Sequence, residues 1–550
     1  MSGTSESFTR NQLLALLAAF SFAWFCNLGY RHLVKPDEGR YAEIPREMLA
    51  SGDWLTPRLN GFKYFEKPPL QYWATAAAFS AFGTTEWAAR LWPGLTGFLG
   101  VLLVFWTGNR LLGPPAGLVG AAVAGGAAIY VAIGHMLTLD MALSFFMSAS
   151  VFAVALAQRD SAGEGERRRW MLLAWAAAAL AVLSKGLVGI VLPAGAAVLY
   201  ALVERDLRFL ARLHVFSGAL LFFAVAAPWF VAVSIVNPEF FRFFFLHEHF
   251  ERFLTREHGR YEPAWYFVPI VLVGVLPWIV SLFPALRHAW QRSSDGAFQP
   301  RRFLLLWCAV VFVFFSASNS KLISYILPIF PALALLIGDY LARSGPRLAL
   351  AQAGVAGVLG LALAVGASRA TRYGPADLPE LVARYAHWLT AAAVALILAA
   401  AISAWLALRA RPQAAAVALA FGSLVSVQAA TSGHEELSPA YSAYHIAQKI
   451  RDQLQPDVPF YVVNTFDQTL LFYLGRTVTM VANKDELAQP ISWEPLNYLP
   501  DTAAFARAWQ ADREAFALFN VNDLDGFLKA HPVPMQIVAR DARRVIVKKP

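Results

Sequence analysis

A short charged segment after the first apolar run carries the residue types of a catalytic site. In the sequence PDEGRY, residues 36–41, Asp37 and Arg40 are three positions apart. A helix places such a pair on one face, with Tyr41 on the same turn. Pro36 suits the first helical position, and the helix dipole keeps a carboxylate in the first turn ionised. We therefore expect a carboxylate beside a cation, which suits transfer chemistry on a phosphate-bearing substrate.

The rest of this segment is predicted to be a helix followed by turns. Pro45 is expected to kink or end the helix. Asn60-Gly61 predicts a turn, and Glu66-Lys67-Pro68-Pro69 closes the segment rigidly. A second cation, Lys67, therefore belongs to the same outer segment as Asp37.

Two isolated charges interrupt the apolar runs that follow. Asp140 stands in HMLTLDMAL, and Lys185 stands in LSKGL with almost no loop around it. A charge at such a depth is costly and is usually functional or paired. We favour function for Lys185 over snorkelling to the interface, whereas Asp140 fits a helix cap and a site equally well. Tyr325, in KLISYILP, has the pattern of an interfacial anchor and is a weak signal alone.

The stretch 237–263 combines a run of phenylalanines with a cluster of charges. Its aromatic side chains suit the headgroup region of a membrane, which favours an amphipathic interfacial helix. His247 and His249 flank Glu248, and Glu66 is another outer carboxylate, so a metal site is the alternative. The two histidines lack the i, i+4 spacing of a strong zinc helix.

The composition identifies the elements that must position these residues. The chain has 550 residues, of which 57% are hydrophobic and only 15% charged, so it is a polytopic membrane protein rather than a soluble one. Its net charge of +9 suits anionic headgroups and phosphate substrates better than nucleic acid. Cys26 and Cys308 both lie in apolar runs, so neither a disulfide framework nor a cysteine-based metal site is expected.

Apolar runs predict about thirteen transmembrane helices. Arginine-rich connections such as 159–169 belong in the cytoplasm by the positive-inside rule. A further run, 69–83, then begins and ends outside, and it is shorter than the about 20 residues needed to cross. We predict an interfacial or re-entrant helix there. The predicted spans are 12–30, 88–109, 114–133, 140–158, 170–184, 187–203, 213–236, 264–285, 302–317, 322–342, 348–367, 388–408 and 413–430.

The predicted fold is a polytopic α-helical membrane protein with a C-terminal extracytoplasmic α/β domain. The membrane domain covers residues 1–430, with an outer catalytic loop at 31–87 and a second outer loop at 237–263. In 431–550, short β-like runs alternate with helical patterns, which predicts a largely parallel sheet. This domain has neither a GxGxxG motif nor a P-loop, so we expect no cofactor in it and a structural or acceptor-guiding role.

The outer segment also resembles a known family. It is similar to the membrane glycosyltransferases of the GT-C class that use polyprenyl-phosphate sugars, and in particular to the bacterial lipid A 4-amino-4-deoxy-L-arabinose transferases. The motif is specific for the superfamily and less specific for the sugar. The resemblance is carried by DEGRYAEI (37–44), SGDW (51–54), TPRLNG (56–61), YFEKPPL (64–70) and KLISYILP (321–328).

The resemblance implies a reaction and a location. The donor is undecaprenyl phosphate carrying 4-amino-4-deoxy-L-arabinose, and the acceptor is a phosphate of lipid A in lipopolysaccharide. The expected reaction is an inverting transfer on the periplasmic face of the bacterial inner membrane, among membrane lipids and without nucleic acid. A cationic sugar on lipid A would weaken the binding of polymyxin and other cationic antimicrobial peptides.

The resemblance also implies roles for individual residues. Asp37 resembles the catalytic carboxylate, Lys67 resembles the ligand of the donor phosphate, and Arg40 and Tyr325 assist. Glu66 and His247 form the implied metal pair, for a divalent ion such as zinc or magnesium. The remaining implied residues are Asp140 as a further catalytic candidate, and Lys185, Arg252, Tyr41 and Arg58 as substrate ligands.

Three alternatives remain beside this interpretation. A transferase of mannose or another sugar to a hydroxyl of a protein or glycan would need Asp37 as a base, because a hydroxyl must lose its proton. A lipid transporter would need inverted repeats with broken helices near the bilayer midplane, whereas the charges cluster at one face. A lipid-binding scaffold would not need Asp37 beside Arg40 and Lys67.

Overall fold

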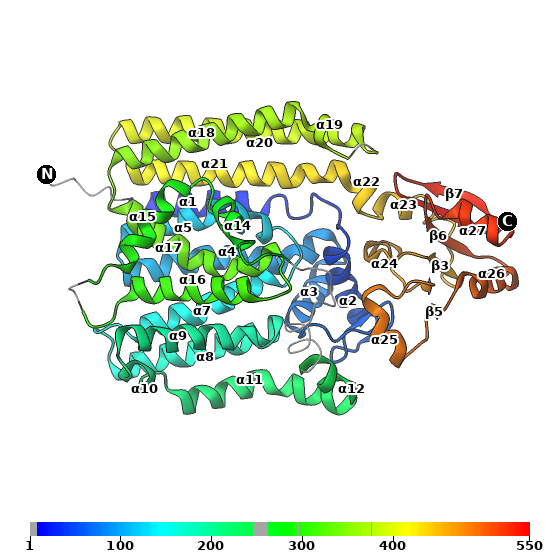
Figure 1. Ribbon diagram of the computed structural model, residues 1–550, viewed down its shortest axis with the longest axis horizontal. Helices are drawn as coiled ribbons and strands as arrows, with labels where there is room; N and C mark the ends of the chain where they lie inside the picture. Colours follow the sequence, from blue (N-terminus) through cyan, green and yellow to red (C-terminus); the bar gives the residue numbers. More distant parts are fainter. Residues whose placement is uncertain (1–7, 246–261, 294–295, 376) are drawn as a thin grey trace.

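A helical body and a mixed α/β domain form the molecule, with the C-terminus in the α/β domain and the short helices α2 and α3 between the two (Figure 1). The computed structural model describes residues 8–245, 262–293, 296–375 and 377–550.

Long apolar helices build the body, because a backbone in lipid must satisfy its hydrogen bonds internally. Among the described residues, eight helices are long and apolar enough to cross a membrane, or ten if each of two bent pairs counts as one span. The predicted number of thirteen is therefore not confirmed. The helices of the body are α1 (Arg10–Phe25), α4 (Glu86–Leu111), α5 (Pro114–Gly126), α6 (Ala128–Gly134), α7 (Asp140–Ala157), α8 (Glu164–Lys185), α9 (Val188–Glu204), α11 (Val215–Val236), α14 (Phe267–Gly274), α15 (Ile279–Trp290), α16 (Pro300–Ala317), η2 (Ile323–Ile329), α17 (Phe330–Ala342), α18 (Pro346–Ser368), α20 (Pro379–Leu408) and α21 (Pro412–Gly433).

The difference between the two numbers has identifiable causes. The pairs α5–α6 and α14–α15 are each bent, by 65° and 107°, at breaks of at most four residues. Predicted runs also coincide with α1 and α9, which have only 16 and 17 residues, and with α8, which begins with a run of charged residues. A sequence window detects apolar composition but not whether the helix is straight or long enough.

Two short helices carry the outer segment. α2 (Asp37–Ser51) continues through Pro45, so this proline does not end the helix, and its C-cap is Gly52, whose φ is +73°. Ten of its fifteen residues are buried, so tertiary packing outweighs the hydrogen bond that Pro45 removes. α3 (Leu70–Phe82) has 13 residues and is not among the candidate spans, which agrees with the prediction that 69–83 does not cross.

The C-terminal domain contains a six-stranded sheet in the order β5-β4-β3-β6-β8-β7. Its strands are β3 (Phe460–Val463), β4 (Thr479–Val481), β5 (Tyr498–Leu499), β6 (Phe516–Asn520), β7 (Gln536–Arg540) and β8 (Arg544–Lys548), and its helices include α23 (Tyr444–Gln448), α24 (Gln468–Leu474), α25 (Ala488–Trp493), α26 (Thr502–Ala511) and α27 (Leu524–Ala530). β5, β4, β3 and β6 are parallel neighbours, whereas β8 is antiparallel to both β6 and β7. The prediction of a largely parallel sheet is therefore confirmed by these four strands, and β8 and β7 add an antiparallel edge, because the tight turn between β7 and β8 allows only antiparallel pairing.

The C-terminal domain and the outer segment share one hydrophobic core. Ile44 of α2 and Phe79 of α3 belong to the same buried cluster as Ile446 and Leu471. At Gly39 the approach is so close that a Cβ would lie 2.5 Å from the backbone nitrogen of Thr469 on α24. The position of α2 therefore depends on the C-terminal domain.

Candidate active site

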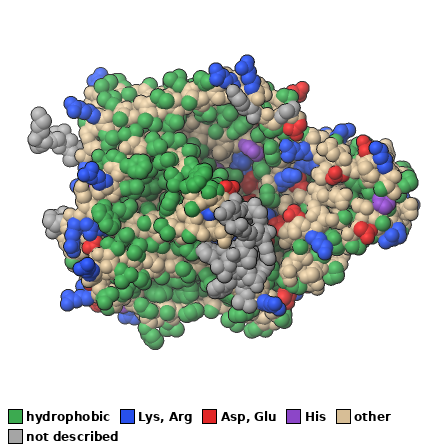
Figure 2. All heavy atoms as spheres, viewed as in Figure 1, with side chains coloured by type: hydrophobic (Ala, Val, Ile, Leu, Met, Phe, Trp, Pro, Cys, Tyr) green, Lys and Arg blue, Asp and Glu red, His purple; other side chains and the backbone are tan. Residues whose placement is uncertain are grey.

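A polar cavity of about 760 Å³ lies between the helical body, the outer segment and the C-terminal domain. Figure 2 shows charged side chains gathered in the hollow at this junction. Eight of the residues singled out from the sequence line the cavity. They are Asp37, Arg40, Tyr41, Glu66, Lys67, Asp140, Lys185 and Tyr325.

Three other predicted residues have different positions. Arg58 is not in the cavity lining: its Nη1 donates to Glu494 Oε2 at 2.8 Å and to the Gly61 carbonyl at 2.6 Å. This guanidinium ties the β1–β2 hairpin (Arg58–Leu59 and Phe62–Lys63) to the C-terminal domain. Arg252 and His247, for which the sequence predicts roles, lie outside the described residues.

Arg40 lies between two carboxylates at the wall of the cavity. Its Nη1 donates to Asp37 Oδ1 at 3.0 Å, one turn earlier on α2, and its Nε donates to Glu486 Oε1 at 3.0 Å. The Arg40 side chain is only 8% exposed, whereas that of Asp37 is 47% exposed. Arg40 is thus fixed in direction, and the Asp37 carboxylate beside it is accessible to a substrate.

Glu486 is a functional candidate that the sequence analysis missed. Burial raises the pKa of Glu486 to about 7, although the charge of Arg40 acts in the opposite direction. Gln468 Nε2 donates to the same carboxylate at 2.9 Å. Glu486 follows the carboxyl end of β4 in NKDEL (483–487), and such strand ends are where open α/β sheets place binding groups.

Lys67 approaches the cavity from the turn before α3. Its Nζ donates to the backbone carbonyl of Glu66 at 2.8 Å and lies 3.7 Å from the Glu66 carboxylate. Two prolines follow directly and limit the backbone freedom of this turn. The ammonium is therefore held at the cavity with a carboxylate beside it.

A second ion pair comes from the helical body. Lys185, the last residue of α8, donates to Asp140, the first residue of α7, and its Nζ lies 4.5 Å from the centre of the Tyr325 ring. The N-cap residue of α7 is Leu139, and no side chain accepts a hydrogen bond from the first turn of this helix. Asp140 therefore acts as a partner of Lys185 rather than as a helix cap. The ring and the carboxylate offset the cost of this deep cation.

A buried ion pair behind the cavity fixes the start of α2. Arg90 of α4 donates from Nε and Nη2 to the two oxygens of Glu38, at 2.7 and 2.8 Å, and from Nη1 to the Arg31 carbonyl at 2.6 Å. Burial raises the pKa of Glu38, but Arg90 and Arg31 outweigh it and lower the pKa to about 2. Glu38 thus remains ionised and anchors α2 so that the neighbouring Asp37 faces the cavity.

Only Glu66 of the predicted metal pair lies in the described part of the chain. It lines the cavity within ion-pair distance of Lys67. A carboxylate oxygen is a suitable ligand for zinc or magnesium. Glu66 therefore fits one position of such a site.

Two family models match the chain. Residues 11–244 match the model described as dolichyl-phosphate-mannose-protein mannosyltransferase, and residues 446–549 match the aminoarabinose transferase C-terminal domain. The first covers a little over half of the predicted membrane domain, residues 1–430, and the second covers most of the predicted α/β domain, residues 431–550.

Several curated proteins are similar in sequence. The undecaprenyl phosphate-alpha-4-amino-4-deoxy-L-arabinose arabinosyl transferase of Edwardsiella ictaluri is 35% identical over 334 residues, which are 60% of this chain and 59% of that protein. The corresponding transferase 1 of Pseudomonas fluorescens is 34% identical over 355 residues, 63% of this chain and 64% of that protein. The aligned parts thus span about three fifths of these relatives.

Solved structures resemble the whole chain. ArnT from Cupriavidus metallidurans bound to undecaprenyl phosphate is 37% identical, with a TM-score of 0.93 and 98% of each chain covered. The Archaeoglobus fulgidus oligosaccharyltransferase in the apo form is 12% identical, with a TM-score of 0.56 over 94% of this chain and 70% of that one. The second likeness concerns the fold alone.

Proposed function

The chain belongs to the ArnT family of aminoarabinose transferases, and we propose that it transfers 4-amino-4-deoxy-L-arabinose from undecaprenyl phosphate to a phosphate of lipid A. The reaction takes place at the periplasmic face of the bacterial inner membrane. The observation that carries the proposal is the cavity that Asp37, Arg40 and Lys67 line together beside the helical body.

The cations of the cavity support a lipid phosphate as the donor. Lys67, Arg40 and Lys185 line the same cavity from three different elements. Such cations bind an anionic phosphate and stabilise the charge that it gains as it leaves. The ArnT of Cupriavidus metallidurans, which this chain matches over 98% of its length, was solved with undecaprenyl phosphate bound.

The reaction is an inverting displacement at the anomeric carbon. An oxygen of the acceptor phosphate forms a bond to this carbon on one face while the bond to the donor phosphate oxygen breaks on the other. The bonding electrons go to the donor phosphate, which leaves as undecaprenyl phosphate between Lys67 and Arg40. The product is a phosphodiester on lipid A.

Asp37 orients the reactants more than it deprotonates them. A lipid A phosphate is already anionic at neutral pH, so it needs no strong base to attack. The accessible Asp37 carboxylate, directed by Arg40, accepts the remaining phosphate proton or pairs with the amine of the donor sugar. Glu486 holds Arg40 in place from the C-terminal domain.

A divalent metal at Glu66 and His247 is a further part of the proposal. Zinc or magnesium there would supply extra positive charge beside the donor phosphate. Arg40 orients Asp37 and Lys67 contacts the donor phosphate whether or not this metal is bound.

A second function is favoured by the mannosyltransferase model that matches residues 11–244. In that case a protein or glycan hydroxyl is the acceptor, and Asp37 must remove its proton. Mass spectrometry of lipid A and of envelope proteins, from cells with and without this chain, separates the two functions. Aminoarabinose on lipid A only in the presence of the chain supports the proposal, whereas a sugar on protein alone contradicts it.

A further inference from the structure

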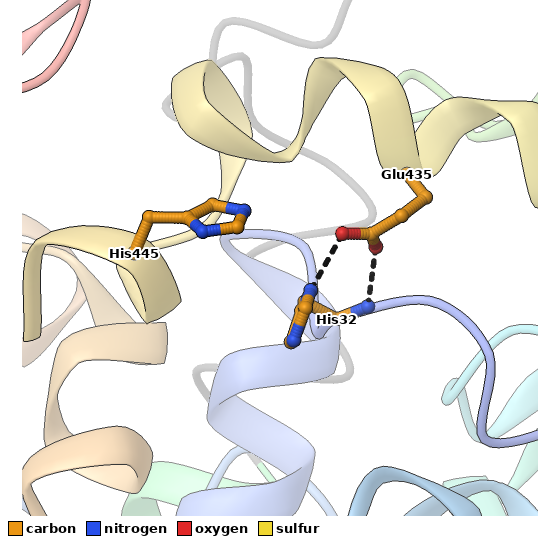
Figure 3. Close-up of side chains that lie close together, drawn as sticks. All are labelled: His32, Glu435 and His445. Atoms are coloured by element: carbon orange, nitrogen blue, oxygen red, sulfur yellow. Dashed lines mark hydrogen bonds and ion pairs between the residues drawn. The ribbon is translucent and has the colours of Figure 1, made fainter. Parts of the chain in front are cut away.

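Two histidines and a glutamate from three separate segments converge outside the cavity. Figure 3 shows His32, Glu435 and His445 with their side chains directed toward one another. His32 precedes α2, Glu435 lies in η3 (His434–Leu437) directly after α21, and His445 lies on α23. One ligand atom of each side chain lies within 4.8 Å of those of the other two. Among the described residues, these three side chains form a group that can hold a metal ion.

The contacts within this cluster are short and directional. His32 Nδ1 lies 2.6 Å from Glu435 Oε1, and the His32 backbone nitrogen donates to Glu435 Oε2 at 2.8 Å. Ser438 Oγ donates to Glu435 Oε1 at 3.0 Å and lies 2.8 Å from His445 Nε2. The three side chains are therefore already held near a common point before any ligand binds.

The donor set selects a class of ion. Two imidazole nitrogens and one carboxylate oxygen are the ligands that zinc takes in open sites, at about 2.0–2.2 Å. Ligand atoms on a tetrahedral zinc ion then lie about 3.3 Å apart. The His32–Glu435 distance of 2.6 Å must widen slightly, and the other two pairs of ligand atoms already lie within 4.8 Å. All three residues are half-buried, so water can complete the tetrahedron.

Neighbouring groups orient the ligands. The Tyr444 ring stacks on His32 with centroids 3.6 Å apart, and the backbone bond from His32 fixes the second oxygen of Glu435. Such outer contacts hold metal ligands in their binding orientation. They also make this cluster a more defined site than a chance grouping of surface carboxylates.

We propose that His32, Glu435 and His445 bind one zinc ion that joins the loop before α2 to the junction of α21 and the C-terminal domain. His32 is three residues before Lys35, which lines the cavity and donates its backbone nitrogen to the Tyr441 carbonyl at 3.0 Å. The ion thus fixes the segment that leads into Asp37. None of its ligands lines the cavity, whereas Glu66 does, so this site is separate from a metal position at Glu66.

The alternative is that hydrogen bonds alone hold these three side chains together. Two substitutions of His445 distinguish a zinc site from this alternative. His445→Gln retains a group that can hydrogen-bond to Ser438 but removes a good zinc ligand. His445→Cys supplies a thiolate, which binds zinc well. His531→Gln is the matched control, because His531 also lies in the C-terminal domain and contacts Thr502 instead.

The full-length proteins are loaded with zinc chloride and dialysed, and bound zinc is measured per chain. We expect the wild type, His445→Cys and His531→Gln to hold about one more zinc ion than His445→Gln. A chelator should lower the thermal midpoint of the first three, and it should lower that of His445→Gln less. Zinc bound elsewhere contributes equally to every variant, so the difference isolates this site.

Glu435→Gln provides a second measurement if His445→Gln does not fold. It removes the anionic ligand and keeps an amide that can accept from His32 and Ser438, so it should also lose about one zinc ion per chain. The proposal is overturned if the wild type and the folded variant bind equal amounts of zinc. It is also overturned if neither protein binds zinc.

Discussion

Arg40 and Glu486 are 446 residues apart in the sequence and form a two-armed ion pair, in which Nε donates to Oε1 at 3.0 Å and Nη2 contacts Oε2. Through this pair the C-terminal domain directs a guanidinium on α2 that also holds Asp37. The domain is therefore part of the wall of the site.

Glu486 should impose a pH dependence on transfer. Burial raises its pKa from the ordinary value of 4.5 to about 7, so the ion pair with Arg40 gains its full charge only above that pH. We expect turnover to rise with pH through about 7 in the wild type. Glu486→Gln should abolish this inflection in a turnover profile measured with saturating donor. An identical inflection in both proteins would assign the titration to another group.

The same carboxyl should affect stability in a defined direction. Its folded-state pKa is raised, so the folded chain binds the proton more tightly than the unfolded chain. The contribution of this group to the free energy of unfolding therefore falls as pH rises from 4.5 to about 7. Reversible denaturation in detergent should show a smaller loss over this range for Glu486→Gln than for the wild type. An equal loss in both would contradict the assignment.

Lys67→Ala should abolish transfer while the protein remains folded. The ammonium is proposed to meet the donor phosphate, so its removal should lower turnover at least about a hundredfold and weaken donor binding. Arg167→Ala, on α8 and paired with Glu164, removes a positive charge far from the cavity lining and should leave transfer unchanged. Equal losses in both variants would show that net charge, rather than this position, matters.

Arg58→Ala should act on stability rather than on turnover. Arg58 pairs with Glu494, and the two side chains are 30% and 26% exposed, so the pair is worth at most about 1 kcal/mol. Thermal unfolding should shift slightly while the turnover with saturating donor stays near the wild-type value. A large fall in turnover would restore the substrate-binding role suggested by the sequence motif.

Gly39→Ala should separate α2 from the C-terminal domain. The added Cβ would lie 2.5 Å from the Thr469 nitrogen, so backbone must shift at a cost of about 1–3 kcal/mol. Gly163→Ala is a matched control, because a Cβ there meets nothing within 4 Å. Unfolding midpoints measured in the same detergent compare the two. A midpoint for Gly39→Ala as high as that of the control would contradict the close packing.

Much of the site was predictable because isolated charges in an apolar chain are conspicuous. Asp140 and Lys185 stand at opposite helix ends and meet in the cavity, as their cost in lipid suggested. Asp37, Arg40 and Lys67 lie in one short segment, so local periodicity and turn residues were sufficient to group them.

The missed features depend on long-range contacts. Glu486 looks like an ordinary surface residue in NKDEL, and it reaches Arg40 because the C-terminal domain packs on the outer segment, for example where α24 meets Gly39. The antiparallel pairing of β8 at one edge of the sheet and the bends in two helix pairs also depend on tertiary arrangement. Arg58 belongs to the motif, but long-range packing places its guanidinium at Glu494 and outside the cavity lining.

If the Asp37 carboxylate acts on the reactants, Asp37→Asn should remove that action. Asparagine keeps the shape and much of the hydrogen bonding of this position but removes the charge. Turnover of undecaprenyl-phosphate aminoarabinose with lipid A, measured on purified protein, should fall about a hundredfold or more. Binding of undecaprenyl phosphate should persist, because Lys67 and Arg40 remain in the cavity. Near-normal sugar transfer by Asp37→Asn would contradict the account.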